Sequence, residues 1–138
     1  MGKRLHVAVK YEVDYSSSAS FNWHNVEFKT LLNDLNVNTY DDEAEFTDGF
    51  GDNWECETKE FDNAFEFLKN HKEDILNYEN DKTFKVNGDD INQESVYDSI
   101  MALEYGDTFD ENYDEVISMM GYWQKQRAKG SYMHFSAF

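Results

Sequence analysis

Hydrophobic and polar residues alternate near the beginning of the chain. From Leu5 to Tyr15, apolar or aromatic side chains occupy every second position, with mostly polar or charged residues between them. A period of two is typical of a β-strand with one buried face. The last residues, 132–138, also have the composition of a strand. We expect them to pair with residues 5–15, which we place at the centre of the sheet.

Four later segments carry the pattern of amphipathic helices. The clearest begins near Asn25, a good N-cap residue, and places Phe28, Leu31, Leu32 and Leu35 on one face at the spacing i, i+3, i+4 and i+7. The last of the four begins with acids and ends with bases, an order that favours the helix dipole. The predicted helices span residues 25–36, 60–78, 93–105 and 110–128.

Turn signals separate further strands. Residues 83–86 read as a strand, and the Asn-Gly pair that follows them is typical of a tight hairpin turn. Glycine, aspartate and asparagine at 48–53 predict another turn. The segments beside that turn, 45–47 and 54–58, are then expected to be short strands of a hairpin.

These elements predict the fold class α+β. We expect one small domain over residues 1–138, with a mixed or antiparallel sheet of three to five strands and about four helices. Helices 25–36 and 60–78 should cover one face of the sheet. Val9 and Leu31 are expected to be buried, because the apolar faces of these elements need a common core.

Charge is the strongest compositional signal. The chain has 29 acidic residues against 12 lysines and arginines, a formal net charge of −17. All 29 acids lie in residues 11–116 with only six lysines, so this stretch carries 6 − 29 = −23. Such a field repels nucleic acid and anionic membranes and favours encounter with basic partners. Solubility of a small domain needs a net charge of only about 2 to 8, so we expect the excess to serve binding.

The segment 41–60 interleaves acids with aromatic residues. It holds nine acids against one lysine, with Phe46, Phe50 and Trp54 among them. Acids spaced by aromatic rings can imitate DNA phosphates and stacked bases. The sequence Glu43-Ala44-Glu45-Phe46 and the later Trp54-Glu55 resemble the antirestriction DNA-mimic family over this short segment. The resemblance implies an inhibitor of DNA-binding proteins; an ordinary acidic hairpin that keeps a sheet edge soluble is the alternative.

We therefore predict a non-enzymatic interaction protein that docks on a basic protein partner of the nucleic-acid-binding kind, without touching nucleic acid or membrane itself. Its working surface is expected to combine the acidic hairpin with the acid-rich start of the last helix. The candidate partner-binding residues are Asp41, Asp42, Glu43, Glu45, Asp48, Asp52, Trp54, Glu55, Asp107, Asp110, Glu111, Asp114 and Glu115.

No catalytic motif accompanies these residues. His134-Phe135-Ser136 matches one half of the His-x-Ser/Thr signature of two-histidine phosphoesterases, but His6 is followed by Val-Ala, so the second half is missing. Cys56 lies between Glu55 and Glu57, whose charges should raise its pKa and blunt its reactivity. We therefore expect no catalytic residue, and we expect the histidines to be ordinary surface residues.

A divalent-cation-dependent module or enzyme is the second hypothesis. Carboxylates recur at i+3 and i+4 intervals between Asp107 and Glu115, and hard cations prefer oxygen ligands. No EF-hand spacing accompanies them, so a solvated helix start is the simpler interpretation, and we expect neither a metal nor a cofactor. A single cysteine, no signal-like start and no long apolar run predict a cytoplasmic protein.

Overall fold

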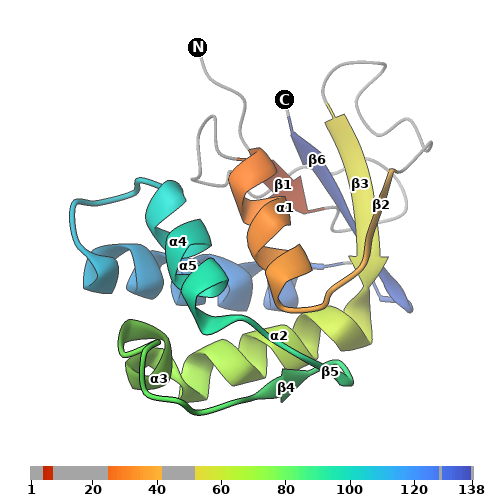
Figure 1. The fold of residues 1–138 in the computed structure, drawn as a ribbon. Coiled ribbons are helices and arrows are strands. Elements are labelled where there is room, and N and C mark those ends of the chain that lie inside the picture. The colour runs from red at the N-terminus through yellow and green to blue at the C-terminus, as the bar shows by residue number, and fades with distance from the viewer. Residues whose placement is uncertain (1–4, 8–24, 42–51, 128, 138) are drawn as a thin grey trace.

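A computed structural model describes residues 5–7, 25–41, 52–127 and 129–137 of the chain. The described residues confirm the α+β fold class (Figure 1). The elements in chain order are β1 (Leu5–Val7), α1 (Asn25–Asp34), β2 (Thr39–Asp41), β3 (Asp52–Glu57), α2 (Thr58–Asn70), α3 (Lys72–Leu76), β4 (Lys85–Val86), β5 (Asp89–Asp90), α4 (Gln93–Ala102), α5 (Phe109–Gln126) and β6 (Tyr132–Ala137).

The main sheet has four antiparallel strands in the order β1-β6-β3-β2. Leu5 lies opposite Ala137, which confirms that the two ends of the chain pair. The prediction that residues 5–15 are central was wrong for the described sheet: β1 lies at its edge, because β6 pairs with β3 over six residues on its other side. The rest of the predicted strand, including Val9, lies outside the described residues.

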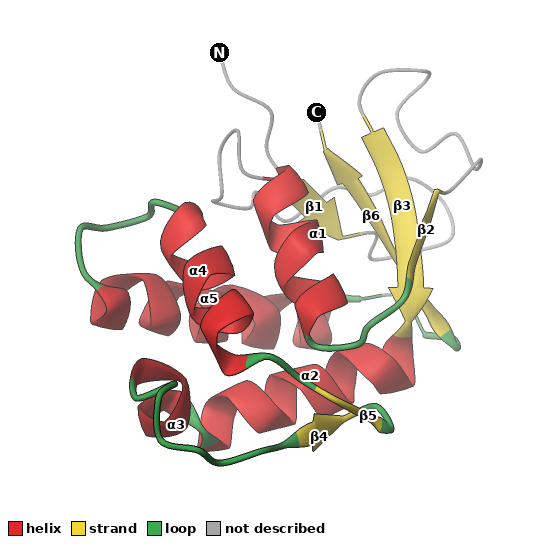
Figure 2. Ribbon diagram, in the orientation of Figure 1, coloured by secondary structure: helices red, strands yellow, loops and turns green. Residues whose placement is uncertain are grey.

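The helices pack on one face of this sheet (Figure 2). Trp54 of β3 and Phe135 of β6 point into the core with ring centroids 4.4 Å apart, and Phe28 of α1 contacts Trp123 of α5 at 5.0 Å. Leu31 is fully buried, as predicted. The aromatic residues of both layers therefore form one continuous core.

The predicted helix 60–78 is two helices. His71, with φ −130° and ψ 30°, separates α2 from α3. The six residues 69–74 are all polar, so no apolar side chain anchors the chain to the core at this point. Instead His71 stacks on Phe67 at 4.5 Å and lies 2.9 Å from Asp74, from Nδ1 to Oδ2. Ile75 of α3 is buried again.

The second sheet is the predicted hairpin after residue 83, formed by β4 and β5. Asn87 and Gly88 at its turn both have positive φ, 54° and 92°, as a tight primed turn requires. Asn36, just after α1, donates from Nδ2 to the carbonyl oxygens of Val86 and Asp89 at 3.1 and 3.0 Å. This amide fixes the hairpin against the end of α1.

No helix among the described residues has both the length and the apolar composition needed to cross a membrane.

Candidate functional site

The expected pairing of strands 45–47 and 54–58 in an acidic hairpin was wrong: residues 54–56 of β3 have β2 (Thr39–Asp41) on one side and β6 on the other, which leaves no free edge there for another strand. Strands β2 and β3 pair with Tyr40 opposite Glu55. Asp41 is 95% exposed at its side chain and lies 3.7 Å from Lys29 Nζ. Glu55 lies 3.5 Å from His134 Nδ1 on the neighbouring strand. The candidates Asp42, Glu43, Glu45 and Asp48, and the expected strand 45–47, lie outside the described residues, as does the side chain of Asp52.

Trp54 is a core residue and not a surface one. Its side chain is 1% exposed and stacks on Phe135. This corrects its assignment to the partner-binding surface. The physical reason is the alternation of β3: Trp54 and Cys56 face the helices, whereas Glu55 and Glu57 face the other way.

The acid-rich start of α5 is exposed, and part of it has a structural role. Asp110, Glu111 and Asp114 are exposed, and Lys72 of α3 lies 3.1 and 3.2 Å from the first and third of these. Hydrogen bonds to Asp110 and Asp114 raise the pKa of the Lys72 ammonium. Thr108 is the N-cap of α5: its Oγ1 accepts from the Glu111 amide, and the same hydroxyl donates to the Glu111 carboxylate. These acids therefore stabilise the α3–α5 contact as well as charging the surface.

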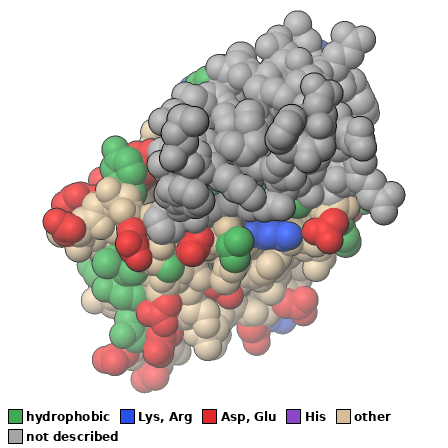
Figure 3. Space-filling model, turned by 90° about the horizontal axis from the view of Figure 1, so that it is seen from above, with side chains coloured by type: hydrophobic (Ala, Val, Ile, Leu, Met, Phe, Trp, Pro, Cys, Tyr) green, Lys and Arg blue, Asp and Glu red, His purple; other side chains and the backbone are tan. Residues whose placement is uncertain are grey.

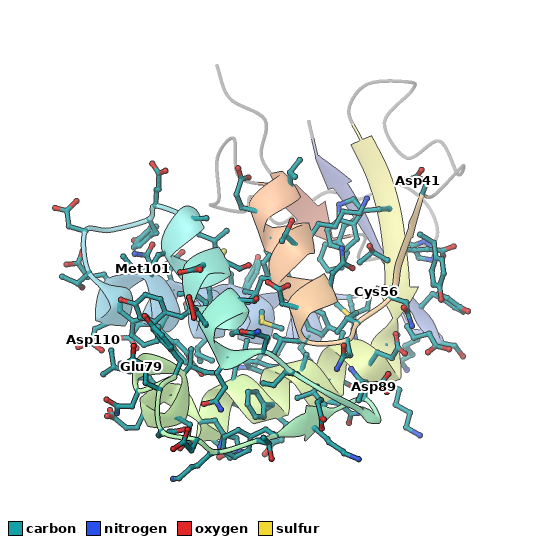
Figure 4. All side chains as sticks on the ribbon, in the orientation of Figure 1. Asp41, Cys56, Glu79, Asp89, Met101 and Asp110 are labelled. Carbon is teal, nitrogen blue, oxygen red and sulfur yellow. The ribbon has the colours of Figure 1, made fainter. Side chains whose placement is uncertain are left out.

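Asp107 is exposed and Glu115 is partly exposed, so both can contribute to a surface. The described parts of the two predicted acidic regions lie apart: Asp41 and Asp110 are at opposite sides of the view in Figure 4. Any docking surface in the described structure therefore uses one region or the other.

A larger acidic surface surrounds the start of α5, and the candidates named from the sequence include only half of it. Residues 86–124 hold ten carboxylates and no lysine, arginine or histidine. We use the name acidic end for a set of exposed acids on α4, in the α4–α5 loop and on the first turns of α5. One further acid of the set comes from the turn after α3. The acids of the set are Glu79, Glu94, Asp98, Glu104, Asp107, Asp110, Glu111 and Asp114.

Several acids of this surface have no structural task. Glu94, Asp98, Glu104 and Asp107 are exposed, and their carboxylates have neither an ion-pair nor a hydrogen-bond partner among the described residues. In Figure 3, acidic side chains with hydrophobic side chains between them border the left of the visible face, on the side of the α4–α5 loop in Figure 1. The signal available in the sequence was the 39-residue interval without a base.

A buried asparagine holds the loop of the acidic end in place. Asn112 of α5 is fully buried, and its Oδ1 accepts from the amides of Tyr105 and Gly106 at 2.7 and 3.3 Å. Its Nδ2 donates to the carbonyls of Gly106 and Thr108 at 3.0 and 2.8 Å. A Cβ on Gly106 would lie 2.7 Å from Glu111 Cβ, so glycine permits this close approach. The loop therefore presents its carboxylates from a fixed backbone.

A hollow of about 460 Å³ opens beside these acids, between the turn after α3 and helix α4. Its lining residues are Leu76, Asn77, Tyr78, Glu79, Asn80 and Tyr97. The Tyr78 and Tyr97 rings are 5.2 Å apart at 57°, and both side chains are partly exposed. Desolvation raises the pKa of the Tyr78 phenol, and the charges of Glu94 and Glu79 raise it further. Aromatic walls in a negative field favour a cationic ligand.

The described residues contain no group of three or more His, Cys, Asp or Glu side chains placed to hold a metal ion. The cation-dependent hypothesis therefore gains no site in this part of the chain. The strand register sets His6 opposite Ser136, while His134 lies beside Glu55. The strand register therefore does not complete the two-histidine phosphoesterase signature, of which His134-Phe135-Ser136 matches one half.

Cys56 is fully buried in β3. Burial raises the pKa of its thiol to about 12, and the negative charge of Glu60 adds to the shift. The sequence argument named Glu55 and Glu57 as the cause; burial is the larger one.

We expect Cys56 to resist alkylation in the native protein. With a pKa of about 12, only about one thiol in ten thousand is ionised at pH 8, and the reagent has no path to it. Iodoacetamide labelling followed by mass spectrometry should be complete in guanidinium chloride and at least about a hundredfold slower without it. Native labelling at the rate of a small free thiol would contradict the burial of this residue.

Comparison with protein-family models, curated proteins and solved structures finds no match to this chain. The functional argument below therefore depends on the charges and geometry of the chain itself.

Proposed function

We propose that this protein is a non-enzymatic interaction protein whose acidic end docks on a basic partner. The observation that carries the proposal is the acidic end itself, with eight exposed acids, seven of which lie in the interval 86–124, where the chain has no basic residue. Lys72 is the base that the described structure pairs with this surface, through Asp110 and Asp114. Most of its negative charge remains available to a partner.

The cost of this arrangement supports a binding role. Like charges at this density repel each other and work against the folded state. Glu94, Asp98 and Asp107 gain no ion pair from the described residues in return. Docking a basic surface would relieve the repulsion and speed encounter, because complementary fields act mainly on the association rate.

The more specific version of the proposal is a mimic of nucleic acid that occupies the binding surface of a DNA- or RNA-binding protein. It is supported by the exposed carboxylates, which repeat at i+3 and i+4 spacing along α4 and α5. An anionic surface of this kind presents charge to a partner as phosphates do. The buried Trp54 cannot imitate a base, so the mimicry proposed here is one of charge.

Competition with DNA tests this version. A labelled DNA duplex is bound to a restriction enzyme, and its fluorescence anisotropy is followed as the protein is added. We expect the wild type to release the duplex. The acidic-end variant, Glu94→Gln, Asp98→Asn and Asp107→Asn, should need about tenfold more protein, because three surface charge contacts contribute up to about 1 kcal/mol each.

A matched variant controls for net charge. Glu66→Gln, Asp89→Asn and Asp90→Asn also change −17 to −14 (−17 + 3), with substitutions on α2 and on the β4–β5 hairpin. It should release the duplex as the wild type does. If both triple variants release the duplex equally poorly, net charge alone explains the effect. A wild type that never displaces the duplex would contradict mimicry of DNA toward this enzyme.

A further inference from the structure

We propose that the hollow between the turn after α3 and helix α4, which Tyr78 and Tyr97 help to line, receives the guanidinium group of an arginine side chain from the basic partner. The inference rests on the proposed function, since it names the chemistry by which that partner is anchored. The hollow, at about 460 Å³, falls within the range of protein ligand sites, roughly 300 to 1,000 Å³. It is large enough for one long side chain entering from solvent.

Both aromatic walls are held in place before any ligand arrives. Tyr97 stacks on Phe109 with ring centroids 4.9 Å apart at 8°, and Phe109 is 7% exposed. Tyr78 packs against Tyr97 at 5.2 Å. Neither phenol hydroxyl has a hydrogen-bond partner among the described residues. A ligand that stacks here therefore displaces no internal contact of these hydroxyl groups.

The backbone of the turn after α3, which carries Tyr78, is also fixed. The amide of Asn77 donates to the Glu73 carbonyl at 2.9 Å, and the amide of Asn80 donates to the Asn77 carbonyl at 3.0 Å. The side chain of Asn80 accepts from the amide of Lys82 at 3.0 Å. Binding to such a preformed site loses little conformational entropy.

The charge around the hollow selects a cation. Glu79 lines it, and Glu94 and Asp98 act on the Tyr78 phenol from α4. Lys82, the base that follows this turn in the chain, lies 3.1 Å from Asp74 Oδ1 and is thereby engaged elsewhere. A metal ion is not favoured, because the described residues supply no group of three ligating side chains.

An acceptor also remains unpaired next to the Tyr97 wall. Gln93 lies one turn before Tyr97 on the same face of α4 and is 8% exposed. Its Nε2 donates to the Lys82 carbonyl, and its Oε1 has no donor among the described residues. Gln93 does not itself line the hollow, so the acceptor that a ligand rich in N–H donors meets there is the Glu79 carboxylate.

Guanidinium fits these walls better than ammonium does. Its planar group stacks on aromatic rings and donates in a fork that matches a carboxylate, whereas the lysine ammonium is a compact and strongly hydrated point charge. The site is therefore expected to distinguish arginine from lysine at equal charge.

Two peptides of equal charge test the assignment on the full chain. Hexa-arginine and hexa-lysine are titrated separately while the aromatic ring signals of the tyrosines are followed by NMR. We expect hexa-arginine to shift the Tyr78 and Tyr97 signals and to bind Tyr78→Leu about threefold to tenfold more weakly. Tyr122→Leu, a change at a partly exposed tyrosine farther along α5, is the control and should bind as the wild type. Tyr78→Phe, which keeps the ring, should retain binding.

The outcomes separate this inference from the function on which it rests. If hexa-arginine binds but the two ring signals do not move, or if Tyr78→Leu binds as well as Tyr122→Leu, the hollow is not the anchor while acidic docking survives. Equal affinity and equal shifts with hexa-lysine would overturn the choice of guanidinium. If neither peptide binds, the proposed function fails as well. Should Tyr78→Leu not fold, Glu79→Gln gives the same comparison.

Discussion

Replacing Trp54 with alanine should lower the free energy of unfolding by about 3 to 5 kcal/mol, the usual cost of truncating a buried aromatic side chain. The indole is 1% exposed, stacks on Phe135 at 4.4 Å and lies 6.4 Å from Phe28. Its removal leaves a cavity where the sheet meets α1. Since domains of this kind are stable by only about 5 to 15 kcal/mol, the variant should be near the limit of folding.

Urea denaturation followed by far-ultraviolet circular dichroism measures this change without depending on the lost fluorophore. Tyr132→Ala is the matched control, since Tyr132 is an aromatic residue of the same sheet that is 40% exposed. We expect that control to cost less than about 1 kcal/mol. If Trp54→Ala were no more costly than Tyr132→Ala, Trp54 would not be part of the core, and its assignment to a partner surface would stand again.

Periodic apolar patterns predicted the elements that local spacing determines. Helix α1 follows from the spacing of Phe28, Leu31 and Leu35, and all three are fully buried. The pairing of the first and last strands is confirmed as well. Their order in the sheet was not predictable in the same way, because several strands had compatible apolar faces and only tertiary packing selects their neighbours.

Of the aromatic residues between acids, Trp54 was interpreted with the wrong periodicity. In β3 the order Trp54, Glu55, Cys56, Glu57 is a strand with one buried and one polar face. The same letters suggested a surface on which acids and rings alternate. The rule of alternation, which predicted the first strand, would have placed Trp54 in the core.

The acidic end and its hollow were only partly accessible from the sequence. The interval without a base is visible in the sequence, but the contact between Lys72 and Asp114 joins residues 42 positions apart. Tyr78 and Tyr97 come together because α3 ends next to α4, and that arrangement depends on the break at His71. Neither proline nor glycine marks the break, and the polar run 69–74 that accompanies it is equally compatible with a continuous exposed helix.

The acidic-end variant should lose its partner while keeping its fold. The carboxylates of Glu94, Asp98 and Asp107 are exposed and have no ion-pair or hydrogen-bond partner among the described residues, so their replacement relieves repulsion. This relief offsets the loss of the favourable charge of Glu94 in the first turn of α4. We expect its melting temperature to equal or exceed that of the wild type. Association with a basic partner should fall by about tenfold or more at low salt, and the difference should shrink as salt screens the remaining charges.

Quantitative cross-linking in an extract of the source cell tests the central claim most directly. Three proteins are cross-linked under identical conditions: the wild type, the acidic-end variant and the matched variant. Both variants have a formal net charge of −14. The proteins attached to each are measured by mass spectrometry. The account predicts that basic proteins are recovered equally with the wild type and the matched variant and are depleted about tenfold with the acidic-end variant. Equal recovery with all three proteins would show that the acidic end is not the docking surface.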